Sequence, residues 1–176
     1  MASNKPIAVL RIKEVYFADP ITSKEAVATT SFKERAPLHF DQDEVGLFRD
    51  KPEKFEVGVH ESDSPIYITY DGVPYKYSGS FTSLTYDQMA ELLGGTAESG
   101  SVELSADVKR LHKAVKMVMS DDTVVVIPNA QGFVTMAGKI GKKSVATFPF
   151  EFECLGASIA WNVAMGFYDT DPTKQD

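Results

Sequence analysis

A short run near the C-terminal end of the chain alternates between apolar and polar side chains with the period of a β-strand. In the stretch 148–154, three phenylalanines and Cys154 occupy every second position, and Pro149, Glu151 and Glu153 lie between them. Side chains two residues apart point to the same face of a strand. Burying each phenylalanine contributes about 1.5–3 kcal/mol, so the aromatic face must meet a core or a partner. The chain therefore contains at least one half-buried strand with carboxylates on its other face.

Further stretches rich in β-branched and aromatic residues predict more strands. They cover 7–17, 54–61, 66–70, 73–77, 123–127 and 133–140. The dipeptide Asp71-Gly72 separates two of these stretches, and both of its residues tolerate the positive φ angles of a type I′ turn. We therefore expect a two-residue hairpin that pairs 66–70 with 73–77. The predicted fold class is mainly β, an antiparallel sandwich or partial barrel.

One α-helix is marked at both ends by its own residues. Thr85 and Gln88 have the spacing of a capping box, in which each side chain accepts a hydrogen bond from a backbone N–H group at the start of a helix. Gly94 and Gly95 supply the left-handed conformation that ends a helix. The helix is expected over 86–93, flanking the sheet.

The stretch 106–119 is compatible with two different structures. Four apolar residues between Val108 and Val118 have the spacing of a helical stripe. The valine and methionine content, followed by a turn at Asp121-Asp122, fits a β-hairpin equally well. The residues themselves leave both alternatives open.

Composition excludes several classes of function. The 176 residues, 43% of them hydrophobic, suffice for one domain with a real core, so 1–176 is taken as a single domain. A net charge of −7 argues against gripping nucleic acid, which depends on concentrated lysine and arginine. A lone cysteine excludes an intramolecular disulfide, and no apolar run approaches the roughly 20 residues of a membrane-spanning helix. We expect a protein made in a reducing cytoplasm, with no membrane partner.

The range 18–52 follows neither a helical nor a strand pattern. It contains three prolines and isolated apolar residues among charged ones. A structureless segment of this length is uncommon inside a compact domain and is commonly functional or disordered. Its aromatic residues argue against disorder. We expect a long loop, arm or hairpin that orders against a partner, whereas the polar end 168–176 is expected to be a flexible tail.

No set of residues has the spacing of a catalytic, metal or cofactor site. The three histidines, His39, His60 and His112, lie far apart in the sequence. The acidic run that begins at Asp41 starts like a calcium loop but has Val45 at its fifth position, where a ligand is needed. The nucleophile motif Gly-x-Ser-x-Gly is absent. We therefore expect neither an enzyme nor a cofactor.

Three stretches in the second half of the chain follow one another in a characteristic order. They are the capped helix with its glycines, 84–96, the strand that ends in 124–130, and the closing strand 144–155. In this order they resemble the tail tube (major tail) proteins of long-tailed bacteriophages. The resemblance implies a β-sandwich flanked by a helix, and subunits that form rings whose inner strands join into one barrel. It also favours a strand over 113–119.

The resemblance implies a structural protein of the virion tail, assembled in the host cytoplasm. Its partners would be copies of itself, in hexameric rings stacked through a long loop and the terminal arms, and other tail proteins such as the tape measure and the terminator. DNA would be present only in transit. Lysines in the bore would hold DNA, because each phosphate that a lysine neutralises adds affinity, whereas an acidic bore repels DNA and lets it pass. Glu151 and Glu153 are the candidates that face the lumen. The candidates for contacts between subunits or rings are Phe32, Leu38, Phe40, Leu47, Phe48 and Trp161.

Three other functions remain open at this point. Another β-rich virion component, a head decoration or baseplate protein, would share the fold class and the self-association. A carbohydrate-binding or adhesion module could use Tyr67, Tyr70, Tyr75 and Tyr77 as a stacking platform, although an ordinary packed sheet also needs such residues. A hydrolytic enzyme is the third, since a missing motif is weak evidence. Trp161 could likewise cover the core of its own chain instead of a partner.

Overall fold

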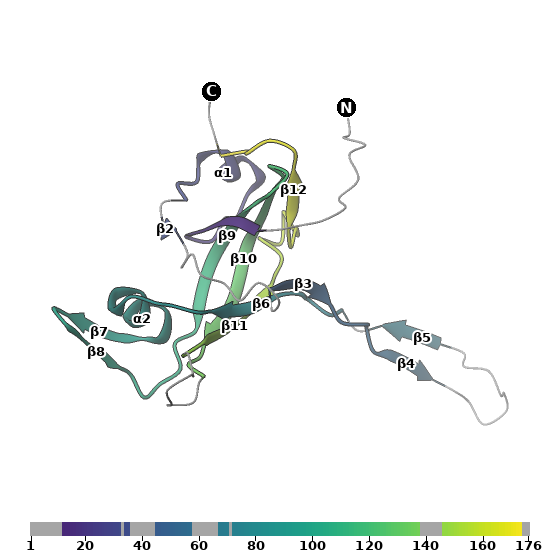
Figure 1. Ribbon diagram of the computed structural model, residues 1–176. Helices are drawn as coiled ribbons and strands as arrows, with labels where there is room; N and C mark the ends of the chain where they lie inside the picture. Colours follow the sequence, from purple (N-terminus) through teal and green to yellow (C-terminus); the bar gives the residue numbers. More distant parts are fainter. Residues whose placement is uncertain are drawn as a thin grey trace.

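An antiparallel sheet that curls into a half-barrel forms the body of the protein (Figure 1). The computed structural model describes residues 12–32, 34–35, 45–57, 67–70, 72–137 and 146–173. Eight strands make up this sheet: β1 (Ile12–Ala18), β2 (Glu34–Arg35), β3 (Gly46–Arg49), β6 (Tyr75–Phe81), β9 (Leu111–Met119), β10 (Val124–Val134), β11 (Phe148–Cys154) and β12 (Gly166–Tyr168). Their order is β2-β1-β9-β10-β11-β6-β3, and β12 pairs with the first part of β10. The mainly β fold class expected from the sequence is confirmed.

The main core lies inside the curl of the sheet. The rings of Phe152 on β11 and Phe17 on β1 are 6.4 Å apart, although β9 and β10 separate these strands in the sheet. Phe150 stacks on Phe81 of the neighbouring β6 at 4.6 Å. Such aromatic pairs contribute about 0.5–1.5 kcal/mol beyond the area that they bury. The alternation predicted for 148–154 is confirmed, because the aromatic face is buried and the carboxylate face is exposed.

Strands β9 and β10 are covered on both faces, which accounts for their continuous apolar sequence. Val115 and Met117 belong to the main core, whereas Ala114 belongs to a second apolar cluster on the other face of β9. Helix α1 (Lys24–Thr29) contributes to this second cluster through Val27, which is 3% exposed. The sheet therefore separates two apolar layers, of which the inner one is larger.

The range 18–52, expected as a loop or arm, is partly structured against its own chain. Ser23 caps α1 by accepting a hydrogen bond from the N–H of Ala26. In the same range, β2 pairs with β1 and β3 pairs with β6. Leu38 and Phe40 lie outside the described residues. The helix was not predicted, because a segment of six residues is too short to show a helical period.

Helix α2 closes one end of the main core and has the predicted bounds, Tyr86–Leu93. Thr85 and Gln88 form the predicted capping box, in which each side chain accepts the other residue's backbone N–H. Leu92 buries the inner side of the helix in the main core. The chain leaves the helix at Gly94, whose φ of 89° favours glycine. A two-stranded hairpin follows, made of β7 (Gly95–Glu98) and β8 (Ser101–Leu104).

The stretch 106–119 forms a strand in its second part. Residues 111–119 constitute β9, which pairs with β1 on one side and β10 on the other. Val108 is 74% exposed, so the helical stripe does not form. A strand is favoured because two neighbouring strands supply backbone partners and both faces are buried. The strand over 113–119 that the resemblance favoured is confirmed.

The strands expected over 123–127 and 133–140 meet in one continuous strand, β10, which contains 124–127 but only the first two residues of the second expected strand, since it ends at Val134. Its pairing with β9 shifts register between Ile127 and Ala130, where Pro128 removes one backbone donor. The parts of the expected strands that cover 7–11, 58–61 and 138–140 lie outside the described residues.

The two-residue hairpin expected at Asp71-Gly72 is wrong. Strand β5 (Tyr67–Tyr70) pairs with β4 (Lys54–Val57), and β6 pairs with β11 and with β3. Both edges of β6 are therefore occupied, which leaves no place for β5 beside it. The local preference of Asp71-Gly72 for a tight turn is outweighed by the pairing of β6 with β3 and β11.

Strands β3, β4, β5 and β6 instead form one long hairpin. Arg49 lies opposite Tyr75 in the pair β3–β6, and Lys54 lies opposite Tyr70 in the pair β4–β5. The register is continuous, because the second pair lies five residues beyond the first on both strands. The base of this hairpin belongs to the main sheet, whereas β4 and β5 project from the body (Figure 1). We call β4 and β5 the arm.

Candidate functional site

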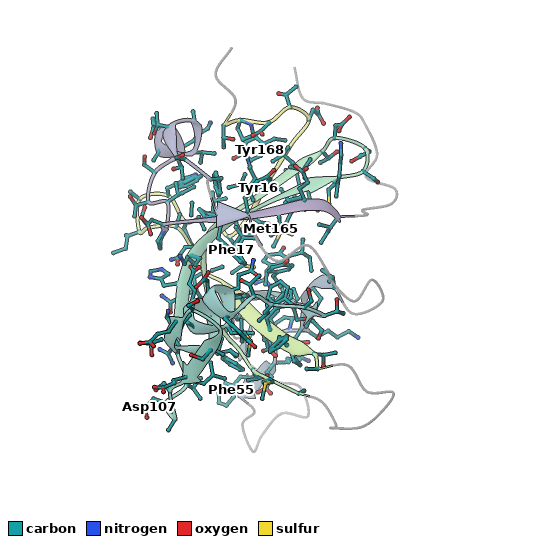
Figure 2. The ribbon with its side chains drawn as sticks, turned by 60° about the vertical axis from the view of Figure 1, so that its left-hand side comes forward. Tyr16, Phe17, Phe55, Asp107, Met165 and Tyr168 are labelled. Carbon is teal, nitrogen blue, oxygen red and sulfur yellow. The ribbon has the colours of Figure 1, made fainter. Side chains whose placement is uncertain are left out.

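The arm is separate from the main sheet and carries an exposed aromatic residue. Its two strands form a separate sheet, and Phe55 on β4 is 59% exposed. An isolated two-stranded hairpin is marginally stable in water. Figure 2 shows Phe55 at the opposite end of the view from Tyr168. Such an arm gains stability when another molecule covers its apolar side chain.

Arg49 braces the base of the arm. Its Nε donates a hydrogen bond of 2.7 Å to the carbonyl oxygen of Val73. Its guanidinium group lies 5.0 Å from the centre of the Tyr75 ring, within the range of a cation–π contact. The first contact joins β3 to the chain that precedes β6, and the second joins β3 to the start of β6 itself, so both brace the point where the arm leaves the sheet.

The outer face of the β3, β6, β11 and β10 strands turns away from the main core. The registers place Phe48, Lys76, Glu153 and Gln131 side by side across these four strands. Glu153 is exposed, and the side chain of Glu151 on the same face is 50% exposed. The candidate acidic residues therefore lie on the solvent side of β11, as the alternation predicted.

One ammonium group on this outer face is shared by nearby carboxylates. The Nζ of Lys76 lies 3.3 Å from an oxygen of Asp50 and 3.6 Å from an oxygen of Glu151. The hydrogen bond that Lys76 donates to Asp50 and the negative charge of Asp50, followed by the charge of Glu151, raise the pKa of Lys76. Asp50, Glu151, Glu153 and Lys76 together carry a net negative charge. The described part of the outer face is thus acidic, with Lys76 as a counterion for two of its carboxylates.

An apolar groove of about 670 Å³ lies beside β3, the end strand of the sheet. Its lining residues are Leu47, Phe48, Arg49, Tyr75, Asn162, Val163, Ala164, Met165 and Phe167. Phe48 and Phe167 are 43% and 44% exposed, whereas Leu47 packs partly against the main core. Two of the candidate contact residues, the sequence neighbours Leu47 and Phe48, thus line this groove.

The two other candidate contact residues that the structure describes lie in the second cluster. Phe32 and Trp161 are partly buried and pack against its buried members. The turn before Trp161 is ordered by Ser158, whose hydroxyl accepts the N–H of Trp161 at 3.0 Å. Both aromatic residues are therefore partly buried against their own chain. For Trp161 this is the alternative role, that of covering the core of its own chain.

A buried ammonium group holds the C-terminal segment against the sheet. Lys116 on β9 is only 8% exposed, and its Nζ lies 3.2 Å from an oxygen of Asp171 and 2.8 Å from the hydroxyl of Thr173. The rings of Tyr16 and Phe32 each lie 5.1 Å from the same nitrogen. The sequence analysis missed this site. Its only local signal is a lysine between two buried residues of a strand.

Asp171 is ionised in this setting. Burial opposes the charge of its carboxylate, but hydrogen bonds from the hydroxyl and the backbone N–H of Thr173, together with Lys116, outweigh burial and lower the pKa of Asp171. The contact between Asp171 and Lys116 is therefore a true ion pair. Residues 171–173, which we call the clasp, belong to the polar end for which a flexible tail was expected.

Burial suppresses the ionisation of two side chains in the main core, Cys154 and Tyr77. Burial raises the pKa of the Cys154 thiol to about 12. Burial, followed by the nearby thiol, raises the pKa of Tyr77 well above its usual range. A thiol that does not ionise near neutral pH is a poor nucleophile. Tyr77 is also 1% exposed, so it cannot share a sugar-stacking surface with Tyr75.

Groupings typical of metal or membrane sites are not found in the described chain. Within the described ranges, no three histidine, cysteine, aspartate or glutamate side chains gather closely enough to hold a metal ion. No helix there has the length and apolar character needed to cross a membrane. His112 lies 2.6 Å from the side-chain oxygen of Asn129, whereas His39 and His60 lie outside the described residues.

Comparison with known protein families and with curated proteins gave no match to this sequence. The geometry of the sheet, the arm and the outer face therefore has to carry any functional conclusion.

Proposed function

We propose that this protein is a tail tube subunit of a long-tailed bacteriophage, which assembles with copies of itself into stacked rings through which DNA passes. The partners would be identical subunits, together with tail proteins such as the tape measure and the terminator. The protein would be located in the virion tail and would have no catalytic role.

The observation that carries this proposal is the arm. A hairpin that continues in register from the main sheet into solvent places an exposed aromatic residue, Phe55, away from the body. We take an identical copy as the partner. An arm that docks on a different surface of the next copy makes a heterologous, head-to-tail contact, which can repeat from copy to copy. Heterologous contacts generate rings or open-ended stacks. In the proposed tube, the arm would make the contact between rings for which the sequence suggested the range 18–52.

The open sheet supports the same proposal. Among the described strands, β3 pairs only with β6 and ends the sheet. An unpaired strand edge is a template for pairing with another chain. The outer face next to it carries Glu151 and Glu153, which suits the wall of a DNA channel because carboxylates repel phosphates.

Electron microscopy of the purified full chain at rising concentration tests this function. We expect rings and then tubes in negative stain. Phe55→Ser should prevent tube growth while leaving a folded subunit, because it removes an exposed apolar side chain of the arm. The matched control is Val108→Ser, which changes another strongly exposed apolar residue outside the arm and should assemble normally.

The competing functions predict other outcomes of the same experiment. Isolated small oligomers of fixed size would favour a head decoration or baseplate protein over a tube subunit. A protein that stays monomeric at every concentration, as seen by analytical ultracentrifugation, would contradict the proposed self-assembly.

A further inference from the structure

One nitrogen atom connects four segments of the chain. Lys116 lies on β9, Tyr16 lies on β1, and Phe32 follows α1, while the clasp follows β12. The Lys116 Nζ contacts the two rings and the two clasp side chains within 5.1 Å. The position of Phe32 and the position of the C-terminal segment are therefore coupled through this ammonium group.

The clasp is prearranged for this contact. One carboxylate oxygen of Asp171 accepts hydrogen bonds from the Thr173 N–H at 3.0 Å and from the Thr173 hydroxyl at 2.7 Å. The other carboxylate oxygen is thus directed to Lys116. The side chains of Lys116 and Asp171 are only 10% and 11% exposed, so water screens the pair weakly. Removing one member of such a pair leaves a buried charge without a partner.

An uncompensated ammonium group cannot stay in this position. When the clasp leaves, Lys116 must reach water, because two aromatic rings do not replace a carboxylate and a hydroxyl. The Phe32 ring covers the ammonium on one side and packs against the second cluster. Hydration of Lys116 therefore favours the departure of Phe32. Opening the clasp would therefore expose Phe32, which is partly buried in this cluster.

We propose that the clasp is a conformational strap: when closed, it keeps Phe32 on its own chain, and when open, it releases Phe32 to a second copy of the protein. The link to a second copy rests on the proposed self-assembly, whereas the coupling between the clasp and Phe32 does not. The strap thereby holds free subunits in a form that assembles only at high concentration.

Hydrogen exchange on the full chain tests the coupling. In the variant Asp171→Asn with Thr173→Ala, the amides of residues 30–32 should exchange at least about tenfold faster than in the unchanged protein. Asp169→Asn is the matched control, because Asp169 is an exposed carboxylate of the same segment, and its exchange should not change. Unchanged exchange at residues 30–32 in the double variant overturns the proposal. If the double variant fails to fold, Thr173→Ala alone provides a milder opening with the same expected direction.

A second background separates the charge from simple packing. Lys116→Met keeps an unbranched apolar chain at the same position but removes the ammonium group. In this background, the two clasp substitutions should change exchange at residues 30–32 less than about twofold. An equally large effect with and without Lys116 would show that the clasp acts as a cover and not through the ion pair, and it would overturn the coupling.

Sedimentation then tests the release to a second copy. The clasp-open variant should assemble at a concentration at least about tenfold lower than the unchanged protein, and Asp169→Asn should assemble like the unchanged protein. Faster exchange with an unchanged assembly concentration would overturn the strap while leaving the proposed tube function intact. An unchanged protein that never assembles would overturn the proposed function, and the exchange experiment would still decide the coupling.

Discussion

Individual side chains set the charge of the outer sheet face. Among the described residues of this face, three carboxylates, those of Asp50, Glu151 and Glu153, lie near the ammonium group of Lys76. The arrangement leaves this face acidic without any carboxylate being buried. Because Glu151 and Glu153 are exposed, reversing their charge should alter the interaction of this face with DNA and leave the fold intact.

Charge reversal at Glu151 and Glu153 to lysine should slow DNA ejection from assembled virions, because lysines add salt-dependent attraction to phosphates. Tubes should still form and look normal in the electron microscope. Glu98→Lys with Glu103→Lys is the matched control, since both residues are exposed and lie on the β7–β8 hairpin. Equal ejection rates in all three proteins would contradict a channel-facing position for β11.

The Tyr77 hydroxyl is buried without a hydrogen-bond partner among the described residues. Tyr77→Phe removes this polar atom and keeps the ring contact with Phe150 at 5.0 Å. We expect the free energy of unfolding in urea to stay the same or to rise by about 1 kcal/mol. In contrast, Phe152→Ala should lower it by about 3–5 kcal/mol, because it opens a cavity in the core. A clear loss of stability in Tyr77→Phe would show that the hydroxyl has a partner.

Among the elements, helix α2 shows most directly how local sequence positions a part of the core. Its capping box fixes where the helix begins, and its Leu92 packs in the main core. Thr85→Ala should lower the free energy of unfolding by about 1 kcal/mol, because one N–H at the start of the helix loses its acceptor. Thr96→Ala, an exposed position on β7, is the control in the same urea titration. Equal stability of both variants would contradict a contribution of the cap.

The arm is the element whose stability depends most on binding a partner. Its register is inherited from β3 and β6, and Arg49 braces its base. Within the part of the chain that the structure describes, β4 and β5 pair only with each other. Pairing with a neighbouring copy would therefore stabilise the arm as well as the assembly.

At the scale of the whole molecule, the ion pair between Lys116 and Asp171 makes stability depend on pH. The pKa of Asp171 is lowered from 3.8 on folding, so its contribution is present above that value and is lost as pH falls through the lower folded pKa. Asp171→Asn should therefore lower the melting temperature at neutral pH. The difference from the unchanged protein should narrow between about pH 5 and about pH 2. A difference that stays constant over this range would contradict an ionised Asp171.

The sequence alone determined the features that depend on near neighbours in the chain. Period-two alternation identified β11 and its two faces, because the direction of a side chain in a strand follows from its position alone. The capping box and the glycines determined both ends of α2, because they act within one turn. The same local patterns were sufficient for the mainly β fold class.

Only the tertiary structure decided which strands pair and which charges meet. Asp71-Gly72 has good chemistry for a turn, yet β6 is occupied on both edges by strands far away in the sequence, so the hairpin cannot form there. Lys116 and Asp171 meet across 55 residues, and no local pattern records that distance. The physical reason is that strand pairing and burial depend on contacts between segments that are far apart in the sequence. A local sequence pattern reports only the preference of one segment.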